Sequence, residues 1–360
     1  MAKLDRRAFA MIGVSTLALG RLPSMLRADQ RLGRHRAIRI RPFDPQDADP
    51  VGRLVDLEYL NDADRASSLY AINRGLHLPG GGRSEWRATL VAESDGAVVA
   101  VGSARSIALG SNPRTHVIVA AAHRRQGIGT ALYREVAALV GARGKTPIAS
   151  IAAREGIAFQ FASACGMRPF MRSRQLTLDL TAWTVDAWCR NAIRQRPGYT
   201  LVPSDDLAPD VFFGALGAAY EYMHERWSAV PRLTPSELRE TWAPRVSQGS
   251  GVVALERGEA IGAGNFFPNE AVDAGVVVFP TGVCRELASL EQERALTAHL
   301  LGDRLLAARS AGKRHAILEF DDDDGRLLPL IASVPVTSVD EAYMLTAGPT
   351  SSWPRPYPHG

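Results

Sequence analysis

The segment from Val119 to Leu132 holds the residues of this chain best suited to chemistry. It reads Val-Ala-Ala-Ala-His-Arg-Arg-Gln-Gly-Ile-Gly-Thr-Ala-Leu, with an apolar run before it and helical spacing after it. Backbone N–H groups in such a turn, together with the positive end of a helix, form an anion site suited to a pyrophosphate. We expect Gly127 and Gly129 to let a phosphate approach the main chain closely, and Arg124 and Arg125 to add charge-assisted contacts.

The sequence does not contain the common nucleotide-binding motifs or a cysteine pattern typical of disulfide or metal sites. The Rossmann pattern needs G-x-G-x-x-G directly after the first strand, and the Walker pattern needs G-x-x-x-x-G-K-[ST]; neither occurs. Cys165, Cys189 and Cys284 are far apart, so the sequence indicates neither a disulfide framework nor a bound metal.

The stretch resembles the acyl-CoA-binding motif of the GNAT superfamily of N-acyltransferases, Gln/Arg-x-x-Gly-x-Gly/Ala. Arg124, Gly127 and Gly129 satisfy that pattern, and Ala121 replaces a common proline. The resemblance implies acetyl-CoA or another acyl-CoA as co-substrate, and a mixed sheet with two central strands that splay apart. The pantetheine arm would lie along Val117, Ile118 and Val119, and the pyrophosphate on Arg124, Arg125, Gln126, Gly127, Ile128, Gly129 and Thr130.

A second motif of the family matches only in part. Ala158, Phe161 and Gly166 fit, but Ala162 stands where the family has a tyrosine that protonates the departing thiol. Such a general acid contributes ~10²–10⁴-fold. Its loss need not abolish turnover, because a thiol of pKa ~8.5 is a tolerable leaving group. Neighbouring Ser163 and Cys165 point away from the direction of position 162 on a helix.

The attacking amine must lose a proton, directly or through water. His116 begins the expected central strand, where the family often places a Glu or His, so we take it as the candidate catalytic base. The alternative is a surface histidine at a strand end. His123 is expected near the phosphates or exposed, and Glu85 and Glu93 are alternative bases.

Two clusters bear on the acceptor. The run Asp321–Asp324 could attract a cationic amine, although a solvated loop is the commoner meaning of such a run. The aromatic segment 220–227 could line an acceptor cleft or pack in the core.

Hydrophobic periodicity predicts a repeated α+β unit. In the first copy we expect strands over 38–42, 86–93, 97–109, 115–120, 148–151 and 175–180, and helices within 44–75 and over 129–142 and 156–165. The order recurs with strands near 252–255, 260–267, 276–278 and 317–318 and a long helix over 286–311. At the corresponding loop, which begins at Thr281, the second copy has no Gly-x-Gly and carries Glu286, which would repel a phosphate, so we expect it not to bind CoA.

The predicted fold class is therefore α+β: two tandem domains, each a mixed, mostly antiparallel sheet flanked by helices. The expected boundaries are a tail over 1–37, a domain with the acyl-CoA site over 38–182, a linker over 183–198, a degenerate domain over 199–348 and a tail over 349–360.

The N-terminal segment differs in net charge from the rest of the chain. Residues 1–41 hold ten basic and two acidic residues, whereas the remainder is mildly acidic, which does not favour a nucleic-acid partner. Residues 5–28 resemble a twin-arginine export signal, and their apolar run is too short for a stable membrane span. We expect a cytoplasmic protein, with export as the alternative, and a monomer with an internal pseudo-dimer, or a homodimer.

The function expected is N-acyl transfer, most simply acetyl transfer, from CoA to a primary amine of a small molecule. Transfer would be direct, within a ternary complex, so that Cys165 is not a nucleophile. The alternative is a catalytically impaired protein that binds acyl-CoA for regulation, which Ala162 and the degenerate second copy favour.

Overall fold

A computed structural model describes residues 38–59, 86–106, 112–151, 156–194, 198–224, 234–243, 246, 249–269, 274–321 and 327–347. The expected tails, Glu85, Glu155 and residues 322–324 of the acidic run lie outside this range. No described helix is both long enough and apolar enough to cross a membrane.

The first half of the chain forms the lobe that carries the Gly-rich turn. Its strands are rich in Val, Ile and Ala, which suit a pleated surface covered by helices. Its elements are β1 (Ile38–Pro42), η1 (Pro45–Asp47), α1 (Ala48–Tyr59), β2 (Arg87–Ser94), β3 (Ala97–Arg105), β4 (Arg114–Val119), η3 (Ala121–His123), α3 (Ile128–Gly141), β5 (Ile148–Ile151), α4 (Ile157–Ala164) and β6 (Arg168–Asp179).

The second half repeats this order. The predicted linker is mostly helical and packs into the second lobe, where Cys189 of α5 lies in one apolar cluster with Leu301 and Leu305 of α8. The elements are α5 (Trp183–Arg194), β7 (Thr200–Pro203), η4 (Ser204–Asp206), α6 (Pro209–His224), α7 (Pro235–Trp242), β8 (Gly251–Glu256), β9 (Glu259–Asn269), β10 (Gly275–Val283), α8 (Leu290–Ser310), β11 (His315–Asp321), α9 (Leu328–Ser333) and β12 (Ser338–Thr346).

The twelve strands in the described part of the chain join one sheet in the order β1-β2-β3-β4-β5-β12-β6-β11-β10-β9-β8-β7. The pairs β4–β5 and β10–β11 are parallel, and the other neighbouring pairs are antiparallel. The predicted fold class, two repeats with mixed and mostly antiparallel sheets flanked by helices, is confirmed.

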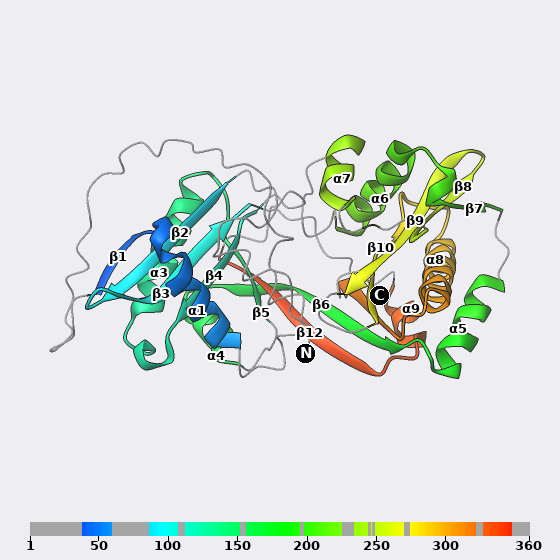
Figure 1. Cartoon of the computed structure of the whole chain (residues 1–360). Helices are drawn as coiled ribbons and strands as arrows, with labels where there is room; N and C mark the ends of the chain where they lie inside the picture. The colour runs from blue at the N-terminus through cyan, green and yellow to red at the C-terminus, as the bar shows by residue number, and fades with distance from the viewer. Residues whose placement is uncertain are drawn as a thin grey trace.

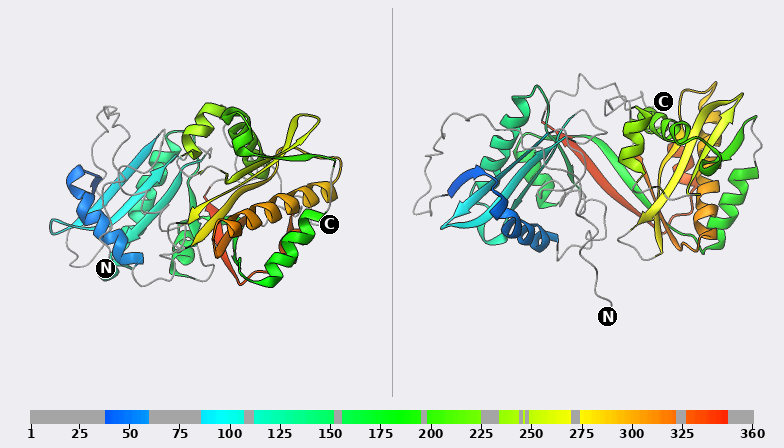
Figure 2. Two further views of the ribbon diagram at one scale, coloured as in Figure 1. Left: turned by 45° about the vertical axis from the view of Figure 1, so that its right-hand side comes forward. Right: turned by 45° about the horizontal axis from the view of Figure 1, so that its top comes forward.

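The two halves exchange their last strands. Strand β12, from the end of the chain, lies between β5 and β6, and β6 lies between β12 and β11. In Figure 1, β6 and β12 run from one lobe to the other, and both views of Figure 2 show the same bridge. Each half therefore completes its sheet with a strand from the other half.

Helices cover both faces of the first lobe's sheet. On one face, Val51, Leu54 and Val55 of α1 pack on Val91, Val101 and Ile118. On the other face, Ile128 and Leu132 of α3 pack on Ala92, Ala100 and the valines of β4. We call these the α1 face and the α3 face.

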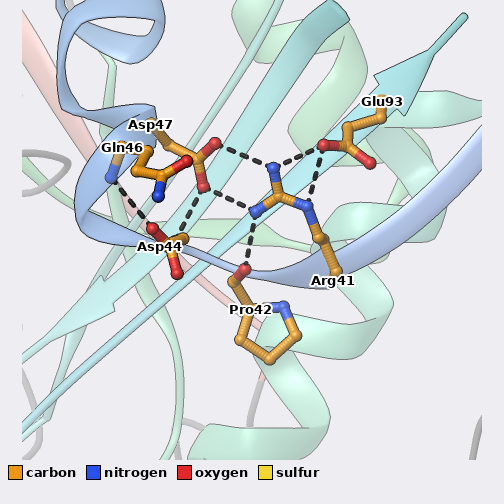
Figure 3. Close-up of polar contacts among 6 residues, drawn as sticks. All are labelled: Arg41, Pro42, Asp44, Gln46, Asp47 and Glu93. Carbon is orange, nitrogen blue, oxygen red and sulfur yellow. Dashed lines mark hydrogen bonds and ion pairs between the residues drawn. The ribbon is translucent and has the colours of Figure 1, made fainter. Parts of the chain in front are cut away.

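An ion-pair cluster fastens β1 to β2 and to the turn before α1. The guanidinium of Arg41 donates two hydrogen bonds to the Asp47 carboxylate, at 2.6 and 2.8 Å, and others to Glu93. Asp47 also accepts from the Asp44 N–H at 2.7 Å, and the Asp44 carboxylate accepts from the Gln46 N–H at 3.0 Å, which closes a capping box at η1 (Figure 3).

Candidate active site

Strands β4 and β5 diverge almost as soon as they meet. Their parallel register consists of the single pair Arg114–Ile148. At this junction the Ile148 N–H donates to the Pro113 carbonyl, and the Thr115 hydroxyl donates to the Ile148 carbonyl, each at 3.0 Å. The second copy keeps four pairs between β10 and β11. The strand splay implied by the resemblance therefore lies beside β4, beyond Arg114.

The backbone of β4 presents alternate residues to this splay. The Ala120 N–H donates to the Val99 carbonyl at 2.9 Å, and the β3–β4 register is regular from Arg114 to Val119. In an antiparallel ladder this places the N–H and C=O groups of His116 and Ile118 toward β3. The corresponding groups of Val117 and Val119 therefore point toward the splay.

The Gly-rich turn follows directly and lies at the surface. Arg125 has a φ of 63° and Gly127 a φ of 81°, and the side chains of Arg124 and Arg125 are exposed. The Arg124 Nε–H donates to the Val119 carbonyl at 3.0 Å, and the Gln126 amide donates to the Ala122 carbonyl at 3.2 Å. These two bonds hold the turn in shape.

The start of α3 has the features of an anion site. Gly127 is its N-cap, no side chain caps it, and its first intrahelical hydrogen bond is from Ala131 N–H to the Gly127 carbonyl. The N–H groups of Ile128, Gly129 and Thr130 therefore have no acceptor within the helix, and the helix dipole adds partial positive charge there.

Glycine is required at positions 127 and 129 for different reasons. A Cβ at Gly127 would meet nothing within 4 Å, but its φ is left-handed, so the turn requires glycine there. A Cβ at Gly129 would lie 3.2 Å from both Phe161 and Val119. Gly129 is therefore also needed for the close packing of α3 against β4 and α4, in addition to the expected approach of a phosphate.

His116 is half-buried on the α1 face. Burial lowers its pKa to about 4, so the ring is neutral near pH 7. Its neighbour across the strand pair is Ser103, whose hydroxyl donates to Thr89 at 3.2 Å. The other described alternatives are less suitably placed: Glu93 is bound by Arg41, and His123 follows the strand in η3.

A tyrosine that the sequence analysis did not single out lies against Ala162. Tyr133 of α3 is 6% exposed and shares an apolar cluster with Ala162, and Val117 and Ala149 of the splayed strands pack on this cluster. Its hydroxyl is buried without a hydrogen-bond partner among the described residues, and burial raises its pKa to about 12. An unsatisfied buried hydroxyl costs free energy, so this atom is suited to a polar ligand atom.

Cys165, at the end of α4, has a pKa raised by burial. A thiol in that state is a poor nucleophile.

The corresponding site of the second copy is occupied by the protein's own side chains. The carboxylate of Glu293, in the first turn of α8, is buried and accepts hydrogen bonds from the Leu287 N–H at 3.2 Å and the Tyr222 hydroxyl at 3.0 Å. Met223 packs on β10, with its sulfur 3.2 Å from where a Cβ of Gly282 would be. Tyr220 and His224 are buried, so the described part of the aromatic segment packs in the core.

The described residues include no group of three or more His, Cys, Asp or Glu side chains placed to hold a metal ion.

Comparisons with known proteins agree with this geometry. The family model "Acetyltransferase (GNAT) domain" matches residues 85–160, which include β4, the turn and α3. No curated protein sequence matches the chain.

Several solved structures share the fold of most of the chain at low identity. A GCN5-related N-acetyltransferase from Sphaerobacter thermophilus is 18% identical with a TM-score of 0.56, over 86% of this chain and 95% of that one. A tandem GNAT protein from the clavulanic acid biosynthesis pathway is 17% identical with a TM-score of 0.58, over 87% and 99%. A fungal glucosamine N-acetyltransferase region is 15% identical with a TM-score of 0.57, over 87% and 38%. The chain therefore contains a segment, residues 85–160, that matches a GNAT acetyltransferase domain, and it shares its fold with a tandem GNAT protein.

Proposed function

We propose that this protein transfers an acyl group, in the simplest case acetyl, from CoA to a primary amine of a small molecule. The observation that carries the proposal is the uncapped, exposed start of α3 directly beside the splayed strands β4 and β5. The N–H groups of Gly127, Ile128, Gly129 and Thr130, with the side chains of Arg124, Arg125 and Gln126, would hold the pyrophosphate.

The pantetheine arm would then continue the sheet beside β4. The main-chain groups of Val117 and Val119 would bond to its amides, and Ile118 would anchor β4 through β3 and the α1 face. The thioester would then lie near His116, at the narrow end of the splay.

The reaction follows from these positions. The neutral amine attacks the thioester carbonyl, the C–S bond breaks with its electron pair going to sulfur, and the ammonium proton leaves through His116 or water. We infer that the Tyr133 hydroxyl donates a hydrogen bond to the departing sulfur, in place of the tyrosine missing at Ala162. The acyl group never resides on the enzyme.

The alternative, an acyl-CoA-binding regulator without turnover, is favoured by Ala162 and by the degenerate second copy. Thiol release from acetyl-CoA, measured over a panel of primary amines, separates the two. Release that depends on an amine establishes the transferase. A thermal shift with acetyl-CoA but no release with any amine would instead establish the binding protein.

A further inference from the structure

Of the three cysteines, Cys165 alone belongs to the lobe that carries the Gly-rich turn. It is a free, half-buried thiol at the end of α4. Cys189 is 1% exposed in the core of the second lobe, and the Cys284 thiol donates to the Ala215 carbonyl at 3.3 Å. Burial raises the pKa of Cys189 and of Cys284 to about 12 each. Cys165 is therefore the thiol best placed to meet a ligand of the first lobe.

The Cys165 side chain lies on the side of α4 that faces α3. The expectation that it points away from the direction of position 162 is wrong, because residues three apart on a helix share a face. Cys165 packs on the apolar cluster that holds Ala162 and Tyr133. One turn earlier, Phe161 meets α3 at Gly129.

Three side chains of α3 lie near the thiol. Thr130 and Arg134 each act to lower the pKa of Cys165, although burial outweighs them and leaves it raised. Tyr133 interacts electrostatically with Cys165, so its hydroxyl is close to the sulfur.

The Tyr133 hydroxyl is the second feature that points to a ligand here. Tyr133 is only 6% exposed, and its hydroxyl has no hydrogen-bond partner among the described residues. A buried hydroxyl in that state is suited to a polar ligand atom. The proposed function gives this place to the sulfur of CoA, which would then lie beside the sulfur of Cys165.

We propose that Cys165 is a modification site, at which CoA disulfide, the oxidised dimer of CoA, attaches one CoA to the protein. This rests on the proposed function, because the turn at Gly127 would hold a diphosphate of the CoA disulfide and bring one sulfur to the Tyr133 hydroxyl. The attached CoA would occupy the acyl-CoA site, so oxidised CoA would inhibit the transferase reversibly.

The step is a thiol–disulfide exchange. The Cys165 thiolate attacks the nearer sulfur of CoA disulfide, and a new S–S bond forms. The old S–S bond breaks with its electron pair going to the departing CoA thiolate, which takes up the proton that Cys165 released. One disulfide replaces another, so no further oxidant is needed, and dithiothreitol reverses the modification.

Binding offsets the low reactivity of this thiol. Only the thiolate attacks, and the raised pKa of Cys165 makes the thiolate scarce at neutral pH, so dissolved disulfides react slowly. A disulfide held by the turn at Gly127 reacts within a complex, where a well-placed reactant has a high effective concentration. The modification is therefore selective for disulfides that carry the nucleotide.

The test treats the full chain with CoA disulfide or with glutathione disulfide, which has the same reactive bond without the nucleotide. Intact-protein mass spectrometry follows the adduct, and peptide analysis maps it. We expect one CoA per chain, on Cys165, formed at least about 10-fold faster than the glutathione adduct. Excess acetyl-CoA should slow the reaction by competition. Calorimetry should show that the modified protein binds acetyl-CoA only after dithiothreitol treatment.

Variants assign the adduct to this site. Cys165→Ser should form none, and Cys284→Ser should form it at the wild-type rate. Gly127→Glu should slow it at least about 10-fold, because the diphosphate is no longer held. Peptide mapping on the wild-type protein makes the assignment independent of whether Cys165→Ser folds.

The outcomes separate this proposal from the proposed function. No CoA adduct, an adduct on Cys189 or Cys284 instead, or equal rates with the two disulfides would overturn it. Any of these results alongside intact binding of acetyl-CoA would leave the transferase proposal standing. A wild-type protein that binds no acetyl-CoA would overturn both.

Discussion

At the scale of single residues, we infer that the buried hydroxyl of Tyr133 would donate a hydrogen bond to the sulfur that leaves CoA. A family tyrosine on α4 is absent at Ala162, and Tyr133 reaches the same cluster from α3.

We predict that Tyr133→Phe lowers kcat by about 10- to 100-fold with little change in the KM for acetyl-CoA, because the donor acts as sulfur departs. Adding Ala162→Tyr to that variant should restore part of the rate, which a merely structural role would not produce. Tyr199→Phe, which removes a hydroxyl bonded to His299 in the second lobe, is the control. An unchanged kcat in Tyr133→Phe would contradict the assignment.

The sequence predicted those site residues that belong to a short motif or to a single strand. Gly127 and the two arginines beside it follow from a motif of six residues, and His116 from its place in a strand. Tyr133 could not be found in this way, because its role depends on how α3 crosses α4. Likewise, the alignment of Arg87, Arg105 and Arg114 depends on the register of three strands, which no local pattern contains.

At the scale of elements, edge strand β1 is held by charge. Arg41 binds the carboxylates of Asp47 and Glu93 and lowers the pKa of each. Because these pKa values are lower in the folded state, the cluster contributes stability above the unfolded pKa of about 4 and loses it as pH falls below that value.

Arg41→Met should therefore lower the free energy of unfolding by about 1–2 kcal/mol at pH 7, since buried Asp47 loses charge-assisted hydrogen bonds. Urea denaturation at pH 7 and pH 3 measures this, and the difference from wild type should shrink at pH 3. Arg39→Met, on the same strand, should have a smaller effect. A difference that stays constant with pH would show that the charges are not responsible.

At the scale of the whole molecule, the exchange of β6 and β12 makes the two repeats one folding unit. Strand β12 pairs with β6 along its whole length, from Ser338 to Thr346. The repeat itself was predictable from recurring patterns, but pairing between segments some 170 residues apart was not. The predicted domain boundaries stay a prediction, and they divide a sheet that is continuous.

Cutting the chain after Thr181 should give halves that depend on each other. We expect chains 1–181 and 182–360, when co-expressed, to form a heterodimer with one cooperative thermal transition. Each chain made alone should lack its neighbouring strand and show no such transition. A 1–181 chain that is monomeric and unfolds cooperatively at the temperature of the whole protein would contradict the exchanged sheet.

The central claim is that the turn at Gly127 binds the diphosphate of an acyl-CoA. Calorimetry with acetyl-CoA tests this binding most directly. Gly127→Glu places a carboxylate at the N-cap of α3, whereas Gly96→Glu makes the same change at a matched φ of 78°, with equally open space, in the β2–β3 turn. We predict binding by wild type and Gly96→Glu and a loss of at least about 10-fold in Gly127→Glu. Equal heats from all three proteins, or none from wild type, would contradict the central claim.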